Sequence, residues 1–87
     1  MALTMGLVQA LHTAVPVAGT AYACVYIGPR PSNVVLFALR RQVSDRARVD
    51  AVKVNMIELL AQAFASGREV IIGHSDADSL ILHVELR

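Results

Sequence analysis

A single long helical pattern divides this chain into three extended segments before it and two after it. The pattern begins at Ser44, which is expected to cap the helix, and continues to about Ser66, where Gly67 is expected to end it. Asp45 and Asp50 fall near the positive end of the helix dipole. The residues that recur at helical spacing and form the main apolar stripe are Val49, Val52, Met56, Leu59, Leu60 and Ala63.

Apolar positions cover more than half of the circumference of this helix, because Val54, Ile57, Ala61 and Phe64 extend the stripe around its side. The polar strip that remains is narrow and contains Arg48, Asn55, Glu58 and Gln62. A helix with so wide an apolar surface is expected to be buried on more than one side. The pattern therefore predicts that the helix contacts other subunits in addition to the sheet of its own small domain.

Five segments have the alternation or the apolar runs that are typical of β-strands. They span residues 4–13, 21–27, 33–41, 69–74 and 80–86, with a loop at residues 15–19 and a turn at residues 28–31. In the second segment Tyr22, Cys24 and Tyr26 share one face, whereas alanine and branched side chains share the other. The third segment is apolar on both faces, so we expect both of its faces to be covered.

The resulting order is β-β-β-α-β-β, an α+β, mainly β arrangement within one domain of residues 1–87. This is the element order of the oligonucleotide/oligosaccharide-binding (OB) fold, a small, partly open five-stranded barrel. A ferredoxin-like fold needs a helix between the first two strands. The seven residues 14–20 contain a proline and a glycine instead, so the OB-fold is the prediction.

Composition excludes several classes of protein. The chain is 55% hydrophobic, which excludes intrinsic disorder. Its one cysteine, Cys24, has no partner for an intrachain disulfide. We expect Cys24 to be a buried, inert thiol. Residues 1–29 contain no charged side chain, but polar residues, Pro16 and Gly19 interrupt them, so no membrane span is expected. No positive charge precedes Arg30, so no signal peptide is expected, and the localisation stays open between the cytoplasm and a mature secreted form.

The second half of the chain resembles the B subunits of pentameric AB-type bacterial toxins, the cholera, pertussis and subtilase cytotoxin families. The resemblance is carried by the long helix that leads into residues 63–72, AFASGREVII, and then by a polar turn and a final apolar strand. It implies a homopentameric ring with helices lining the centre, glycan sites on the barrels and a separate A-type chain as a partner. One cysteine cannot form the intrachain disulfide that those secreted subunits commonly carry.

Two groups of residues are candidates for ligand binding. Tyr22 and Tyr26 could stack on sugars or bases, or could instead contact a neighbouring subunit. The polar segment 74–79 offers His74, Asp76, Asp78 and Ser79. This segment has too few oxygen ligands for a calcium-binding loop, and its residues are too close together to form a Ser-His-Asp catalytic triad. We therefore interpret it as a turn that can contribute to a ligand site. Because OB barrels bring strand two and the loop after strand four together, one ligand is expected to touch both groups.

These observations predict a non-enzymatic subunit with no cofactor and no metal, assembling with copies of itself and binding glycan. In such a ring Asn55, Glu58 and Gln62 would face the central channel. Two alternatives stay open: a single-stranded nucleic-acid-binding OB protein, and a purely structural oligomer. The net charge of +1 and the scarcity of aromatic residues weigh against nucleic acid. The arginines at positions 40, 41, 46 and 48 are interspersed with aspartates, and we expect them to be solvated near the start of the helix.

Overall fold

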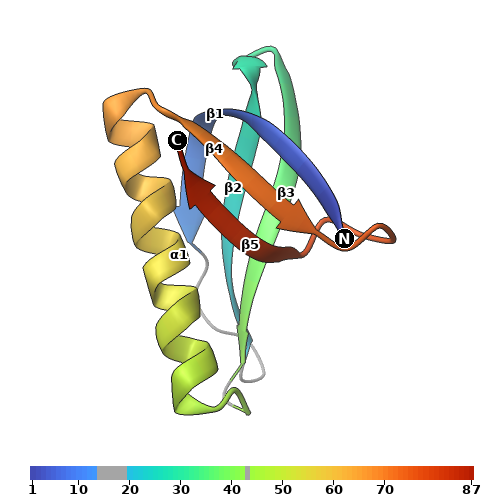
Figure 1. The fold of residues 1–87 in the computed structure, drawn as a ribbon, viewed down its shortest axis with the longest axis vertical. Coiled ribbons are helices and arrows are strands. Elements are labelled where there is room, and N and C mark those ends of the chain that lie inside the picture. The colour runs from blue at the N-terminus through green and yellow to red at the C-terminus, as the bar shows by residue number, and fades with distance from the viewer. Residues whose placement is uncertain (14–19, 43) are drawn as a thin grey trace.

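The computed structural model describes residues 1–13, 20–42 and 44–87 (Figure 1). Its elements are β1 (Ala2–Thr13), β2 (Thr20–Arg30), β3 (Asn33–Gln42), α1 (Ala47–Ser66), β4 (Glu69–His74) and β5 (Ile81–Leu86). The predicted order of three strands, one helix and two strands is therefore confirmed. The loop expected at residues 15–19 lies outside the described residues.

β1 is the central strand of a five-stranded antiparallel sheet with the order β3-β2-β1-β4-β5. Its first half, Ala2–Leu7, pairs with β4. Its second half, Leu7–Thr13, pairs with β2, and this pairing contains a bulge between Val8 and Ala10. A bulge bends a strand and increases its twist, which lets one long strand serve two different partners.

The two edge strands of the sheet, β3 and β5, meet at one point. Ala38 and Leu80 form an isolated parallel bridge, and the amide of Ala38 donates a hydrogen bond of 3.0 Å to the carbonyl oxygen of Ser79. No longer ladder joins β3 to β5 within the described ranges, so the sheet is not closed. The helix α1 runs along one side of this open sheet (Figure 1).

The core lies between α1 and the inward face of the sheet. β2 buries Ala23, Val25 and Ile27 and exposes Tyr22, so the alternation predicted for this strand is confirmed. The largest side chains that are fully buried are Val25, Ile27, Leu39, Leu60, Val70 and Ile72. They come from β2, β3, α1 and β4, so one small apolar cluster holds the helix and the sheet together.

The end of β2 differs from the prediction. A turn was expected at residues 28–31, but β2 continues to Arg30 and the chain reverses at Pro31–Ser32. The register with β3 shifts just before Arg30. A Cβ atom on Gly28 would lie 1.9 Å from the carbonyl oxygen of Asn33, so only glycine permits this close approach of the two strands.

The two ends of α1 are capped differently. Gly67 has a φ of 68° and its amide donates back into the last turn, which confirms the predicted C-terminal stop. The N-cap position is Arg46, whose side chain makes no capping hydrogen bond, so the N-cap predicted at Ser44 is wrong. The carboxylate of Asp45 accepts a hydrogen bond from the amide of Gln42 and closes the preceding turn, so the helix starts later.

Several apolar residues that were expected to be covered are exposed in the chain. On β3, Val35 and Leu36 are 55% and 45% exposed, so this strand is not covered on both faces. On α1, Val49 and Val52 are 46% and 52% exposed, and both fully buried residues lie in the second half of the helix. Cys24 is half-buried rather than buried, because it shares the outward face of β2 with the two tyrosines.

Candidate functional site

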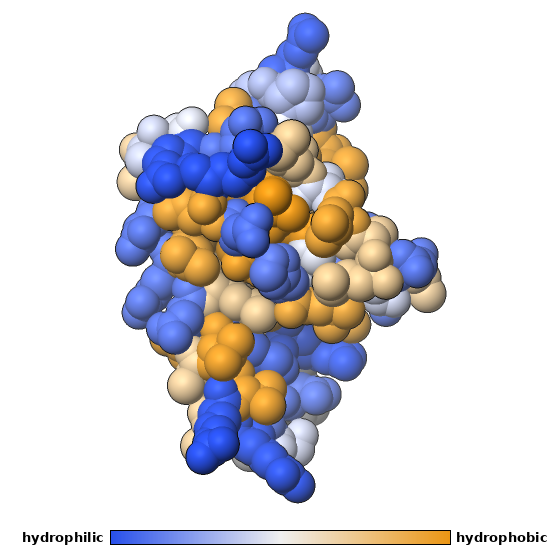
Figure 2. All heavy atoms as spheres, in the orientation of Figure 1, coloured by the Kyte–Doolittle hydropathy of each residue, from blue (hydrophilic) through white to orange (hydrophobic). Residues whose placement is uncertain are grey.

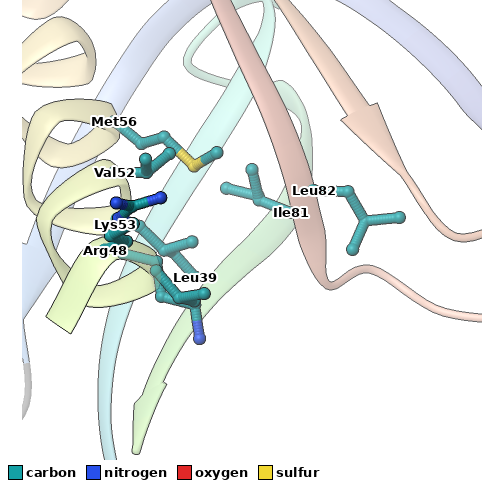
Figure 3. A pocket seen from close by; sticks show the side chains of 8 residues that line it. Leu39, Arg48, Val52, Lys53, Met56, Ile81 and Leu82 are labelled. Carbon is teal, nitrogen blue, oxygen red and sulfur yellow. The ribbon is translucent and has the colours of Figure 1, made fainter. Parts of the chain in front are cut away.

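A groove of about 410 Å³ runs between the first half of α1 and the strands β3 and β5 (Figure 3). The residues that line it are Leu39, Arg48, Val49, Val52, Lys53, Met56, Ile81 and Leu82. Ligand sites in proteins typically enclose roughly 300–1,000 Å³ and are lined mainly by apolar side chains. The groove meets both conditions and is therefore a candidate binding site.

Helical spacing and strand alternation together build the groove. Because residues three or four positions apart share one face of a helix, Val49, Val52 and Met56 line one wall. Ile81 points from β5 toward Met56, whereas Leu82 points to the other side of β5 (Figure 3). The sequence identified the apolar stripe on the helix but predicted that it would be covered. It contained no signal for the groove, which depends on how far apart β3 and β5 lie.

Two ion pairs, which we call the polar clamp, fasten the end of β3 to the start of α1. Arg41 donates from Nε and Nη2 to the two carboxylate oxygens of Asp50, each over 2.8 Å. Lys53 donates from Nζ to Asp45 over 2.8 Å and to the carbonyl oxygen of Arg40 over 2.7 Å. A planar guanidinium holding both oxygens of one carboxylate fixes the orientation of each group. The clamp therefore sets the position of the helix wall of the groove.

The polar clamp lowers the pKa of both of its carboxyl groups. The hydrogen bond from the Gln42 amide, and then that from Lys53, hold the pKa of Asp45 below its ordinary value, although desolvation opposes them. The hydrogen bond from Arg41 lowers the pKa of Asp50 in the same way, and it raises the pKa of the Arg41 guanidinium. Hydrogen bonds to a charged form favour that form, so both pairs stay ionised well below neutral pH.

The other arginines of this region face solvent. Arg40, Arg46 and Arg48 are exposed. Within the described ranges no carboxylate lies within ion-pair distance of these three side chains. Arg41 is the exception in the basic run, because Asp50 already neutralises it. The groove therefore has a cationic rim at the end where the helix begins.

The two tyrosines predicted to bind ligand lie on the outward face of β2, and they have different surroundings. Tyr22 is 39% exposed and pairs across the sheet with Arg40. Tyr26 is half-buried, and its ring centroid is 6.1 Å from that of His12. A hollow of about 290 Å³ beside it is lined by Gln9, Ala10, Tyr26, Pro31 and Val34. Tyr22 is thus the more accessible of the two rings.

His74 is held within the fold. Its Nδ1 lies 3.0 Å from the carbonyl oxygen of Ser75, its Nε2 lies 3.0 Å from the hydroxyl oxygen of Thr4, and its ring centroid is 4.9 Å from that of Phe37. A carbonyl oxygen can only accept, so Nδ1 donates to Ser75, while Nε2 and the hydroxyl of Thr4 share the other hydrogen bond. Both nitrogens of His74 are therefore engaged within the chain, and they connect the polar turn to β1.

The polar turn that follows His74 is stabilised by its own backbone. Asp78 accepts a hydrogen bond of 2.9 Å from the amide of Leu80, as in an Asx turn, and Asp76 lies 3.7 Å from the amino group of Met1. The carbonyl of Ser79 forms the bond to β3 described above. Among the described residues, no hydrogen bond joins this turn to either tyrosine, so the two predicted groups are not in polar contact.

The remaining predicted residues lie on the exposed side of α1. Asn55, Glu58 and Gln62 are all exposed, as a solvated strip requires. In the part of the chain that the structure describes, no group of three or more His, Cys, Asp or Glu side chains is arranged to hold a metal ion. Nor does that part contain a helix that combines the length and the apolar character needed to cross a membrane.

Comparisons with protein-family models, with curated proteins and with solved structures find no match for this chain. The function must therefore be inferred from its own residues and their arrangement.

Proposed function

We propose that this protein is a non-enzymatic OB-type subunit that assembles with copies of itself and presents a binding surface. The OB-type assignment is supported by the order of the elements and by the parallel contact of Ala38 with Leu80, where the two edge strands meet. A partly open five-stranded barrel has the same general form. The resemblance to toxin B subunits supports a ring of five chains, partnership with a separate A-type chain, and glycan as the ligand class.

The observation that carries self-assembly is the amount of apolar surface that the chain leaves exposed. Large apolar side chains that are 45% exposed or more occur at the N-terminus and on β1, β3, α1 and β5; they are Met1, Leu3, Met5, Val35, Leu36, Val49, Val52, Phe64 and Leu82. Figure 2 shows hydrophobic residues gathered in several clusters over one face. Monomeric proteins rarely expose extended apolar patches, and burial contributes about 25 cal/mol per Å².

The ring places different parts of the chain in different surroundings. The exposed strip of Asn55, Glu58 and Gln62 would face a wet central channel. The glycan surface would use Tyr22, whose ring is accessible, and the exposed carboxylates of Asp76 and Asp78. Aromatic rings provide flat apolar contact and carboxylates accept hydrogen bonds from hydroxyl groups, which is the chemistry of sugar recognition.

Native mass spectrometry of the chain at micromolar concentration tests the assembly. The expected result is a multiple of the 9.4 kDa chain mass, with five copies as the predicted number. A single mass of 9.4 kDa from a chain that still unfolds cooperatively would overturn the proposal. A glycan array with the parent and with Tyr22→Ala tests the ligand class, and equal binding by both would place the sugar site elsewhere.

One observation favours the nucleic-acid alternative. Tyr22 lies opposite Arg40 on the outward face of β2 and β3, and Arg46 and Arg48 add exposed positive charge at the same end of the helix. An aromatic ring beside cations is a platform on which bases stack. The test is the binding of a labelled oligonucleotide at several salt concentrations, because phosphate contacts make the affinity fall as salt rises.

A further inference from the structure

The groove beside α1 has an apolar floor and one wall that water reaches. Leu39 on β3 and Ile81 on β5 form the floor, because they are only 1% and 5% exposed. Val49 and Val52 on α1 form the wall and are about half exposed. Of the helical residues that line the groove, Met56 lies furthest from the helix start, and Ile81 points toward it (Figure 3). An apolar chain that lies along this wall therefore displaces water from apolar surface.

The polar side chains that line the groove are both cationic. They are Arg48 and Lys53, and the other six lining residues are apolar. Arginine and lysine side chains donate hydrogen bonds but accept none. A ligand that makes polar contacts with these side chains must therefore offer hydrogen-bond acceptors. A negatively charged acceptor makes the stronger bond, so the lining favours an anionic group joined to an apolar body.

Of these two cations, Arg48 is the one that is available to a ligand. Nζ of Lys53 already donates to Asp45 and to the carbonyl oxygen of Arg40. Arg48 is exposed, and within the described ranges no carboxylate lies within ion-pair distance of it. The aliphatic stem of an arginine can lie along apolar surface while its guanidinium stays in water. Arg48 therefore supplies a cationic position that adjoins the apolar wall.

The charges around this end of the groove do not balance. Residues 40–53 contain five arginines and lysines and two aspartates, so their net charge is five minus two, or +3, in a chain whose total is +1. Both aspartates already belong to the polar clamp, where Arg41 and Lys53 hold them. The surplus positive charge comes from arginines that face solvent. Such a local excess attracts anions to the start of the helix.

The helix also indicates the length of ligand that fits. From Arg48 to Met56 the axis of α1 rises about 12 Å, at ~1.5 Å per residue. An extended decanoate anion has about the same length. The groove volume of about 410 Å³ lies in the range that is typical of small-ligand sites. A medium-length aliphatic chain therefore spans the groove from its cationic end to its apolar end.

We propose that the groove binds the anion of a medium-chain fatty acid. The carboxylate pairs with the guanidinium of Arg48, and the alkyl chain lies along Val49 and Val52 with its methyl end between Met56 and Ile81. The site lies within one chain, so this inference goes beyond the proposed self-assembly and does not depend on it. Exposed apolar residues outside the groove stay available for assembly; they are Met1, Leu3, Met5, Val35, Leu36 and Phe64.

Isothermal titration calorimetry of the parent chain with decanoate at neutral pH tests the site. The expected result is saturable binding of one decanoate per chain. Affinity should fall about fourfold for each methylene removed, in octanoate and then hexanoate, because each methylene contributes its own burial. Decyltrimethylammonium, which has the same chain and the opposite charge, should bind more weakly than decanoate. Equal binding of the two would show that the cationic end of the groove plays no part.

Two arginine variants test the position of the carboxylate. Arg48→Gln should weaken decanoate binding by roughly threefold to tenfold, because it removes one exposed charged partner. Arg48→Glu should weaken decanoate further and improve the binding of decyltrimethylammonium. The matched control is Arg30→Gln, since Arg30 is also an exposed arginine but does not line the groove. It should keep the parent affinity.

A second pair of variants tests the apolar wall. Val52→Asp places a negative charge where the alkyl chain would lie and should abolish decanoate binding. Phe64→Asp is its control, because it introduces the same charge on the same helix outside the groove. The two positions are 52% and 50% exposed, so the fold should tolerate both changes. Circular dichroism and thermal melting verify folding, and Val49→Asp replaces Val52→Asp if that variant fails to fold.

The outcomes separate this inference from the proposed function. If decanoate does not bind saturably, or if Arg48→Gln and Val52→Asp bind it as the parent does, the fatty acid site is wrong whatever the oligomeric state. If the parent binds decanoate but has the mass of one chain by native mass spectrometry, the site stands and self-assembly is wrong. Equal losses with Val52→Asp and Phe64→Asp would show adsorption to apolar surface in general and would also overturn the site.

Discussion

The two halves of α1 show that one hydrophobic pattern can have two structural outcomes. In the second half, Leu60 and Ala63 are fully buried against the core. In the first half, Val49 and Val52 continue the same stripe but remain about half exposed beside the groove. The second half is held by packing and the first half by the polar clamp. A helical stripe therefore indicates which face is apolar, but the sheet beneath decides whether that face is covered.

The largest expected effect comes from removing side-chain volume in the packed half. Leu60→Ala should lower the free energy of unfolding by roughly 2–5 kcal/mol, because it removes a fully buried side chain and leaves a cavity. The matched change in the other half, Val52→Ala, should cost under about 0.5 kcal/mol in the isolated chain. Urea denaturation at a concentration where the chain is monomeric measures both. Equal losses would contradict the contrast between the halves.

A smaller effect is expected at the end of the packed half. Gly67→Ala should destabilise the protein by about 1 kcal/mol, because a Cβ atom disfavours the left-handed conformation at a φ of 68°. Gly67→Asn should lose less, since asparagine tolerates this conformation better than alanine. Thermal melting of the two variants ranks them, and the reverse ranking would show that the cap geometry is not what stabilises this end.

At the start of the clamped half, a substitution should stabilise the protein. Arg46→Ser supplies the capping oxygen that the N-cap position lacks, and its extended backbone is suited to that role, so a gain of about 1 kcal/mol is expected. Ser44→Ala serves as the control and should change little, because Ser44 does not occupy the cap. If Ser44→Ala lowered the stability by as much as Arg46→Ser is expected to raise it, Ser44 would be the residue that caps the helix.

The smallest effect concerns pH. The pKa values of Asp45 and Asp50 are lowered in the fold, so their contribution to stability is present above the unfolded aspartate pKa of about 3.9 and is lost as the pH falls through the folded values. Melting temperatures measured from neutral pH down to pH ~2 should therefore fall less steeply in acid for Asp45→Asn/Asp50→Asn than for the parent. Equal slopes for the double variant and the parent would contradict this prediction.

The elements of the fold follow from local patterns, whereas their relations do not. Alternation along residues 21–27 predicted which side chains of β2 are buried, and Gly67 predicted where the helix ends. The start of the helix was missed because Asp45 bonds to Gln42 and Lys53, and Lys53 lies eight residues further along the chain. The continuation of β2 beyond Gly28 depends on the close approach of Gly28 to the backbone of β3, and local propensity does not encode this contact.

The candidate site was harder to predict than the fold. Tyr22, Asp76 and Asp78 are exposed as a binding surface requires, but His74 is engaged by Thr4, seventy residues away in the sequence. The groove combines residues from α1, β3 and β5, so no single stretch of sequence reveals it. Residue types in a short segment predict what a side chain can bind, but tertiary contacts decide which of its atoms are free.

The division of β1 between two partners has a consequence for how the chain folds. Its second half pairs with β2, close in sequence, whereas Ala2 at its start pairs with His74 near the other end of the chain. Joining such distant residues costs loop-closure entropy, so the pairing of β1 with β4 should form after the hairpins. During synthesis the first half of β1 is made before β4. Until β4 pairs with it, the backbone hydrogen-bonding groups of this half and the side chains of Leu3 and Met5 are accessible to other chains. A nascent copy is thus most prone to mispairing before its last strands have emerged.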